Sequence, residues 1–210
     1  MLEDKRGTLF FPMEEWRVEI KKKAHTLSQR FNALTEYQEA ERKAVLKELL
    51  GELNEGVSFN APITFHYGVH TKIGKNTFFN FNFTCQDDTE VIIGENCDFG
   101  PNVTIVTPLH PMLPEERKGL LCPDGVKRRL CWAKPVIIQD RCWICANVTI
   151  LPGVTIGENT VIGAGSVVTH SIPANVFAAG NPCRVIRQLC ESDSLKNKPE
   201  ILGDCQVMGD

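Results

Sequence analysis

The chain has 210 residues, of which 23% are charged, and its formal net charge is −3. This length allows one full-sized domain with a sizeable buried core. A slightly acidic balance disfavours proteins that bind nucleic acid or membrane surfaces, because both need a basic face. The charged start and the lack of a long apolar run lead us to expect a soluble, cytoplasmic protein.

Residues 1–55 are rich in charged residues and show helical spacing. Apolar residues between Trp16 and Phe31 predict one helix. A second helix is expected from about Thr35 to Leu53, with Thr35 as N-cap and Gln38 completing a capping box. We therefore expect residues 1–55 to form a small helical cap.

After residue 56 the chain is built from six-residue units, which are strict between Ile138 and Thr169. The fifth position of each unit is small or β-branched. The first positions are Ile138, Ile144, Ile150, Ile156, Ile162 and Val168. Each six-residue face of a parallel β-helix turns one branched residue inward, which gives this period. The repeats predict a mainly β fold, a left-handed parallel β-helix over residues 56–190.

Nine cysteines are present. Cys142 and Cys145 are three residues apart, but they lie inside the repeat, where Cys142 takes an inward position. This favours free, buried thiols in a reducing compartment over a metal site.

The repeat stops between Ile105 and Ile138, and we interpret residues 107–135 as an extended loop. Long inserts in a compact solenoid are usually functional or disordered. The run 127–129, Lys-Arg-Arg, is either a solvated loop tip or part of an anion-binding surface. Residues 191–210 are polar and are expected to form a loosely held tail.

Histidines are the main candidates for chemistry. His110 lies between Leu109 and Pro111 at the root of the loop, a suitable place for proton transfer near neutral pH. His66 and His70 are four residues apart and could instead form a metal pair. No covalent-nucleophile signature is present, so direct attack of an activated substrate on a bound donor fits better.

Several segments together resemble the maltose/galactoside O-acetyltransferase family of hexapeptide-repeat acyltransferases, over nearly the whole chain. The segments that carry the resemblance are 80–84, 92–97, 100–104, 110–111, 143–144, 151–159, 161–169 and 179–187. The hexapeptides alone indicate only the β-helix. The Asn-Phe-Asn, His-Pro and Gly-Asn-Pro segments, in this order, point to the family.

The resemblance implies a homotrimer with active sites between subunits and acetyl-CoA as co-substrate, with no metal. It implies transfer of an acetyl group to a hydroxyl of a sugar or a similar small acceptor. His110 matches the general base, which would take the hydroxyl proton while the oxygen attacks the thioester directly. Neither nucleic acid nor a membrane is an expected partner.

The resemblance also assigns binding residues. Asn80 and Asp88 match acceptor-side polar residues, although either could be a turn or loop-capping residue. The positions that match the CoA-binding residues are Trp143, Ala146, Ala164, Thr169, Arg184 and Arg187. The Ala146 main chain matches a donor to the oxyanion. The two arginines match phosphate partners, and as surface residues they could instead be solvated charges.

The chain departs from the family pattern at several positions. Pro12 stands where the family has an acidic residue near the acceptor, with Glu14 and Glu15 close by. Cys145 replaces a glycine, and the loop after His110 is longer than in the bacterial sugar enzymes. The acceptor therefore stays open. Two rival functions are a metal-dependent enzyme like the γ-carbonic anhydrases, using His66, His70 and His110, and a non-catalytic β-helix scaffold.

Overall fold

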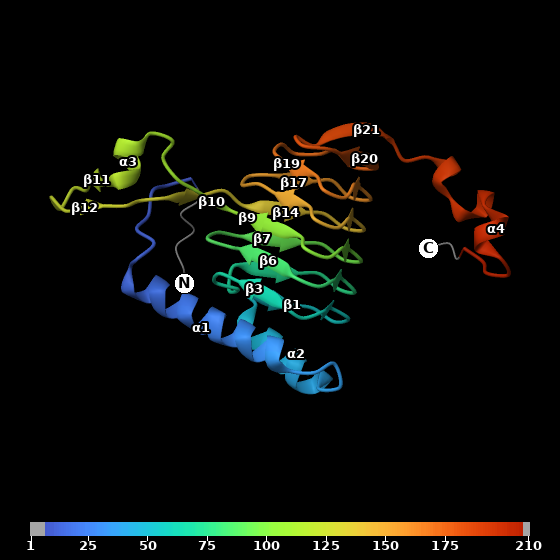
Figure 1. Cartoon of the computed structure of the whole chain (residues 1–210), viewed down its shortest axis with the longest axis horizontal. Coiled ribbons are helices and arrows are strands. Elements are labelled where there is room, and N and C mark those ends of the chain that lie inside the picture. Colours follow the sequence, from blue (N-terminus) through green and yellow to red (C-terminus); the bar gives the residue numbers. More distant parts are fainter. Residues whose placement is uncertain (1–6, 208–210) are drawn as a thin grey trace.

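The computed structural model describes residues 7–207. Two helices, α1 (Glu15–Ala33) and α2 (Glu39–Leu49), lie against the first coils of a β-helix (Figure 1). The predicted architecture, a mainly β parallel β-helix with a small N-terminal helical cap, is confirmed. Among the described residues no helix is long and apolar enough to cross a membrane.

Three stacked sheets form the walls of the β-helix, and all their pairings are parallel except that between β20 and β21. Sheet 1 contains β1 (Glu52–Leu53), β4 (Thr71–Ile73), β7 (Val91–Ile93), β14 (Val136–Ile138) and β17 (Thr155–Ile156). Sheet 2 contains β2 (Ser58–Phe59), β5 (Phe78–Phe79), β8 (Asp98–Phe99), β15 (Trp143–Ile144), β18 (Val161–Ile162), β20 (Val176–Ala179) and β21 (Arg184–Gln188). Sheet 3 contains β3 (Ile63–Phe65), β6 (Phe83–Gln86), β9 (Thr104–Val106), β16 (Thr149–Ile150) and β19 (Val167–Val168). The chain turns three corners per coil: the first lies between sheets 1 and 2, the second between sheets 2 and 3, and the third between sheets 3 and 1.

The core follows the six-residue pattern. Every first-position residue from Ile138 to Val168 is at most 1% exposed, as the repeat predicts. In the earlier coils the inward residues of sheet 2 are aromatic, and Phe79 stacks between Phe59 and Phe99 with ring centroids 4.1 and 4.5 Å apart. The apolar column therefore continues through the coils where the sequence pattern slips.

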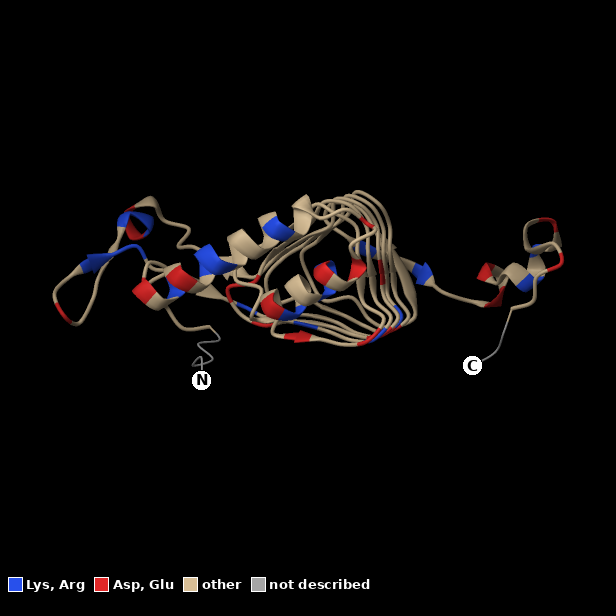
Figure 2. Cartoon of the chain, turned by 90° about the horizontal axis from the view of Figure 1, so that it is seen from below, with Lys and Arg blue, Asp and Glu red and all other residues tan. Residues whose placement is uncertain are grey.

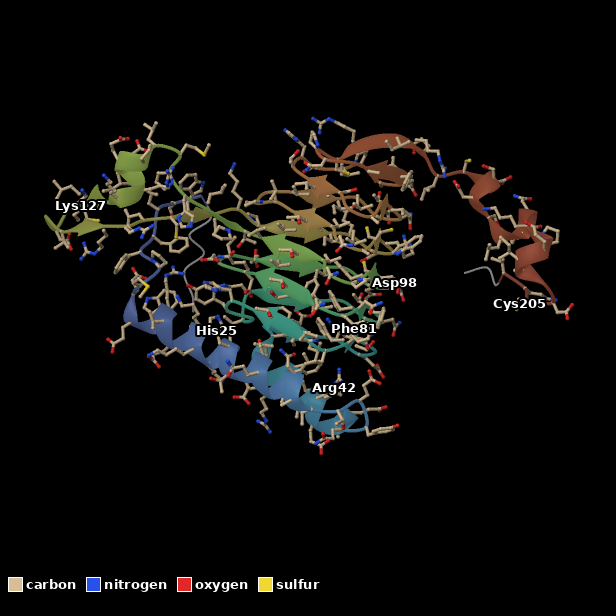
Figure 3. All side chains as sticks on the ribbon, in the orientation of Figure 1. His25, Arg42, Phe81, Asp98, Lys127 and Cys205 are labelled. Atoms are coloured by element: carbon tan, nitrogen blue, oxygen red, sulfur yellow. The ribbon has the colours of Figure 1, made fainter. Side chains whose placement is uncertain are left out.

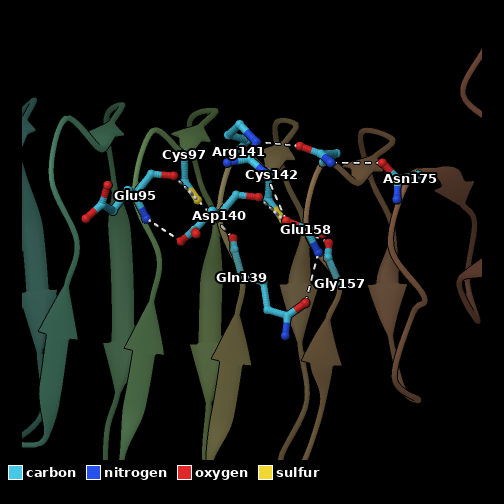
Figure 4. A network of polar contacts seen from close by, with 10 residues as sticks. Glu95, Cys97, Gln139, Asp140, Arg141, Cys142, Gly157, Glu158 and Asn175 are labelled. Atoms are coloured by element: carbon cyan, nitrogen blue, oxygen red, sulfur yellow. Dashed lines mark hydrogen bonds and ion pairs between the residues drawn. The ribbon is translucent and has the colours of Figure 1, made fainter. Parts of the chain in front are cut away.

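The first corner explains the recurring asparagines. Its residues adopt positive φ, a conformation that asparagine tolerates better than most residues. The corner residues with φ between 54° and 60° are Asn76, Asn96, Arg141, Asn159 and Asn175. Figure 4 shows the network here: Arg141 donates to Asn159 (2.7 Å), which donates to Asn175 (2.8 Å). Side-chain bonds between coils thus tie the corners together.

The cap differs in detail from the prediction. The Gln38 carboxamide oxygen accepts from the Thr35 backbone N–H (3.1 Å), but these residues stay in a turn and α2 begins only at Glu39. At the other end α2 stops at Leu49, because the chain enters β1, which pairs with β4. The β-helix therefore begins four residues before the predicted boundary at 56.

The loop 107–135 leaves the third corner and projects away from the β-helix (Figure 1). Strands β10 (Pro108–Leu109) and β13 (Trp132–Ala133) pair antiparallel at its base. Beyond them lie α3 (Pro114–Lys118) and an antiparallel pair of β11 (Leu120–Leu121) and β12 (Lys127–Arg128), which we call the tip hairpin. A bridge between Phe10 and Cys131 attaches the N-terminal segment to the loop. The excursion therefore has its own secondary structure.

The C-terminal tail extends away from the opposite side (Figures 1 and 2). It contains two short 3-10 helices, η1 (Glu191–Asp193) and η2 (Leu195–Asn197), and helix α4 (Pro199–Leu202). None of these three elements buries a residue. The tail elements therefore add no residue to the buried core.

Candidate functional site

His110 follows β10, where the chain leaves the third corner. Pairing of Leu109 with Trp132 fixes the strand that precedes it. The His110 side chain is exposed and, within residues 7–207, makes no hydrogen bond to another protein group. It lines a cavity of about 450 Å³ together with Phe11, Pro12, Met13, Arg117, Lys127, Arg128, Arg129 and Leu130. The ring is thus free to accept a proton from a molecule in this cavity, which we call the loop cavity.

Asp88 lies one coil away at the same corner and is 8% exposed. Its backbone N–H donates to the Thr107 hydroxyl (2.8 Å), which in turn donates to the Gln86 carbonyl oxygen (2.9 Å). These bonds join the Asp88 turn to the start of the loop that carries His110. The Asp88 Oδ2 atom is buried and has no hydrogen-bond partner in the described part of the chain.

Burial is the main cause that raises the pKa of Asp88 to about 6, and the neighbouring Asp87 charge adds to it. The charges of Arg17 and Lys21 act in the opposite direction. Asp87 is fully buried but well bonded, because it accepts from the Tyr67 N–H (2.8 Å) and the Thr71 hydroxyl (2.9 Å). Of the two acids, Asp88 is therefore the one that has a carboxylate oxygen without a hydrogen-bond partner among the described residues.

The second corner carries a different group of predicted residues. Trp143 on β15 is 54% exposed, as expected for an outward position. The Ala146 N–H has no acceptor among the described residues, whereas the next N–H, of Asn147, donates to the Pro101 carbonyl (2.9 Å). Asn80 lies at this corner too, and its Oδ1 accepts from the Phe81 N–H (2.9 Å) and from the Asn60 amide (3.2 Å). Within residues 7–207 the Ala146 N–H is thus a main-chain donor without an acceptor at this corner.

Ala164 is exposed at the same corner, one coil from Ala146. Thr169 follows β19 near the third corner, and its hydroxyl contacts the His170 ring (2.8 Å).

The two predicted phosphate partners lie on β21, at the end of the β-helix. Arg184 donates to the Cys183 carbonyl oxygen (2.9 Å) and carries no acidic partner in residues 7–207. Arg187 makes two bonds to the Asp193 carboxylate (2.6 and 2.7 Å). Asp193 therefore occupies the guanidinium edge that a phosphate would need.

Comparison with known proteins decides the family. Residues 135–170 match the bacterial transferase hexapeptide model (six repeats), and residues 6–54 match the maltose acetyltransferase hexapeptide capping motif. The galactoside O-acetyltransferase of Escherichia coli (strain K12) is 41% identical over 187 residues, which cover 89% of this chain and 88% of that protein. The chain belongs to the maltose/galactoside O-acetyltransferase family. It is therefore an acetyltransferase, and the predicted family is confirmed.

Solved structures of this family share the fold. A galactoside acetyltransferase in complex with coenzyme A superimposes with a TM-score of 0.82 at 38% identity, over 97% of this chain and 95% of that one. A maltose O-acetyltransferase from Clostridium difficile 630 gives 0.81 at 36% identity, over 88% and 94%.

Within one chain the predicted family site is divided between two corners. His110, Asp88 and Thr169 lie near the third corner, and Asn80, Ala146 and Ala164 lie at the second. Sheet 3 separates them, and a four-residue strand such as β6 spans about 10 Å. A single subunit therefore does not bring His110 and Asn80 together.

The rival metal site gains no support from the arrangement of histidines. Within residues 7–207 no group of three or more His, Cys, Asp or Glu side chains could hold a metal ion. His66 lies beside His25, with ring centroids 5.8 Å apart, and His70 bonds the Asp87 carbonyl oxygen (2.7 Å). His110 belongs to the loop cavity.

Sequence reasoning missed two features of the site. The first is Arg17, which is only 4% exposed and whose guanidinium lies 4.3 Å from the centre of the Phe10 ring and 4.2 Å from that of Trp16. Its charge acts on Asp88 from α1. The sequence pattern could not predict this burial, because charged residues of an amphipathic helix are normally exposed. The second is Tyr67, which is 1% exposed and whose buried hydroxyl lies near the charges of Arg17 and Asp88.

Proposed function

We propose that this enzyme transfers an acetyl group from acetyl-CoA to a hydroxyl of a sugar or a similar small acceptor, with His110 as general base. The observation that carries the proposal is the free, exposed His110 ring on the wall of a cavity large enough for such an acceptor. The galactoside and maltose O-acetyltransferase relatives support the acceptor class, and the coenzyme A complex supports the donor.

The proposed reaction needs one general base and one hydrogen-bond donor to the oxyanion. A ring nitrogen of His110 takes the proton of the acceptor hydroxyl as its oxygen attacks the thioester carbonyl carbon. The Ala146 N–H, which has no acceptor among residues 7–207, donates to the oxyanion of the tetrahedral intermediate. When the intermediate collapses, the C–S bond breaks and the His110 proton passes to the departing thiolate. Holding both substrates together supplies much of the rate.

We propose that a homotrimer completes the site, because one chain keeps its two groups of residues on different corners. The third corner of one subunit would then meet the second corner of its neighbour. Light scattering on the purified protein measures the assembly. A mixing experiment tests the shared site: His110→Ala and Asn80→Ala, each inactive alone, regain activity when unfolded and refolded together. No recovery in trimers shown to contain both variants would contradict a site shared in this way.

Thiol release from acetyl-CoA, measured with a panel of sugars and hydroxylated small molecules, tests the function. We expect His110→Ala to lower kcat by about a hundredfold or more, as for loss of a general base. Met112→Ala is the matched control, because Met112 is an exposed loop residue two positions away that does not line the cavity. Near-full turnover of His110→Ala at saturating acetyl-CoA would show that the mechanism is wrong.

A further inference from the structure

The loop cavity is lined by positive charge. Four of its residues besides His110 are cationic, namely Arg117, Lys127, Arg128 and Arg129, and none is acidic. The loop as a whole carries six Lys or Arg against three Asp or Glu, a net charge of +3, whereas the complete chain is −3. The loop therefore concentrates positive charge on one side of an acidic protein. Figure 3 shows Lys127 on this projecting loop, far from Asp98 and Phe81 across the β-helix.

Most of this charge is not compensated within the loop. Arg128 pairs with Asp124 (2.7 Å). Arg117 donates instead to two main-chain carbonyl oxygens, of Pro111 (3.1 Å) and Met112, so its positive charge persists. Lys127 and Arg129 form no ion pair with any described residue. Three cations around one cavity are thus left without a carboxylate.

The cavity holds these groups in place. The Lys127 stem packs over Gly119, where an added Cβ would lie only 2.9 Å from the Lys127 Cγ atom. The Arg117 bonds to the segment just after His110 fix its guanidinium beside the base. Lys127 and Arg129 are two residues apart, a spacing that places side chains on the same side of an extended chain. A cleft walled by one sign of charge attracts ligands of the opposite sign and raises their local concentration.

We propose that the loop cavity recognises an acceptor that carries an anionic group, a carboxylate, sulfate or phosphate ester, on the molecule whose hydroxyl is acetylated. This inference rests on the proposed function, because it places the acceptor beside His110. Guanidinium groups bind such oxyanions through two parallel hydrogen bonds, and lysine adds a point charge. His110 and the three cations would hold the two ends of one small molecule.

The phosphates of coenzyme A are the other source of the same chemistry. Two observations favour the acceptor. The cations line the same 450 Å³ cavity as His110, and this volume suits a small molecule of sugar size. The two arginines predicted for the CoA phosphates lie on β21, at the end of the β-helix and away from the tip hairpin (Figure 1).

Matched acceptors test the inference. Thiol release is measured with a neutral hexopyranoside, the corresponding hexuronate, and the hexose 6-sulfate and 6-phosphate. For the wild type we expect kcat/KM to be about tenfold or more higher with at least one anionic acceptor than with the neutral one, the effect of a charge-assisted bond. The double variant Lys127→Ala/Arg129→Ala is expected to lose this preference, so that its kcat/KM for the anionic acceptors falls to its value for the neutral one. Lys118→Ala, which removes a cation of the same loop outside the cavity, is expected to keep the preference.

Three results would overturn the inference. One is equal kcat/KM for neutral and anionic acceptors in the wild type. Another is an anion preference that survives in the double variant. The last is a rise in the KM of the double variant for acetyl-CoA, with no change in its acceptor preference. This result would assign the cations to the binding of acetyl-CoA.

A binding measurement keeps this inference separate from the proposed function. Calorimetric titration of the anionic acceptors into the wild type, the double variant and Lys118→Ala needs no turnover. Saturable binding that only the double variant loses supports the cavity even if no acceptor is acetylated, a result that would defeat the proposed function alone. Acetylation of neutral acceptors without anion binding would defeat this inference alone.

Discussion

Asp88→Asn offers the sharpest test of the buried acid at the third corner. The substitution keeps the shape of the side chain and removes its ionisation. In the folded protein the pKa of Asp88 is raised from its ordinary value of 3.8 to about 6, chiefly by burial. A carboxyl with a raised pKa stabilises the folded state fully below pH 4, and this contribution is lost as the pH rises through 6.

The size of the effect follows from the shift. A change of about two pKa units corresponds to about 3 kcal/mol between the protonated and ionised forms. The variant does not titrate at this site. Its stability relative to the wild type should therefore improve by about 3 kcal/mol between pH 4 and pH 8, or roughly 6–12 °C in Tm for a chain of this size. An asparagine amide without a hydrogen-bond partner would lower the stability of the variant by the same amount at pH 4 and at pH 8. The test is therefore how the stability difference between variant and wild type changes with pH.

Thermal unfolding of both proteins, followed by circular dichroism at half-unit steps from pH 4 to pH 8, measures this difference. Asp98→Asn, which alters an exposed acid on β8, is the control and should show no such trend. A Tm difference between Asp88→Asn and the wild type that stays constant across this range would refute the reasoning.

Other predictions concern the corners and the CoA side. Asn159→Ala should lower the free energy of unfolding by about 2 kcal/mol, since it loses two side-chain hydrogen bonds and places alanine at φ 58°. Asn159→Gly loses the same bonds without the backbone strain and should lower it by about 1 kcal/mol. Equal losses for the two variants in denaturant unfolding would contradict this prediction. Asp193→Ala should lower the KM for acetyl-CoA by a few-fold at most, because it frees the Arg187 guanidinium from an exposed and therefore weak ion pair. An unchanged KM would argue against a phosphate at Arg187. Gly100→Ala should lower kcat about a hundredfold, because its Cβ would lie 2.6 Å from the Ala146 nitrogen and displace that hydrogen-bond donor. A normal kcat in the folded variant would show that the Ala146 N–H does not stabilise the oxyanion.

The parts of the fold that depend on local periodicity could be predicted from the sequence. One inward residue in six is a property of each coil, so Ile138 and its successors revealed the β-helix. The exposure of Trp143 followed from the same phase. The start of α2 was wrong by four residues, because Thr35 and Gln38 satisfy each other in a turn outside the helix.

Contacts between distant segments could not be predicted. The strands of the tip hairpin are two residues long, too short for alternation to show. Arg17 is buried in part by Phe10, which is bridged to Cys131 of the distant loop. The convergence of Lys127 and Arg129 with His110 requires the loop to fold back on itself. The parts of the candidate site that lie outside the six-residue repeat are therefore the hardest to predict from the sequence.

The loop 107–135 is inserted into the β-helix without disturbing the pairing of the coils on either side of it. Across the insertion Val91 still pairs with Val136 and Thr104 with Thr149, in the same parallel register as coils joined by ordinary corners. Because coil stacking is complete without the loop, changes in its length or charge leave the β-helix core intact. Under our proposal that the loop cavity binds the acceptor, substrate preference and fold stability reside in separate parts of this chain, and exchanging the loop is the direct route to a new acceptor specificity.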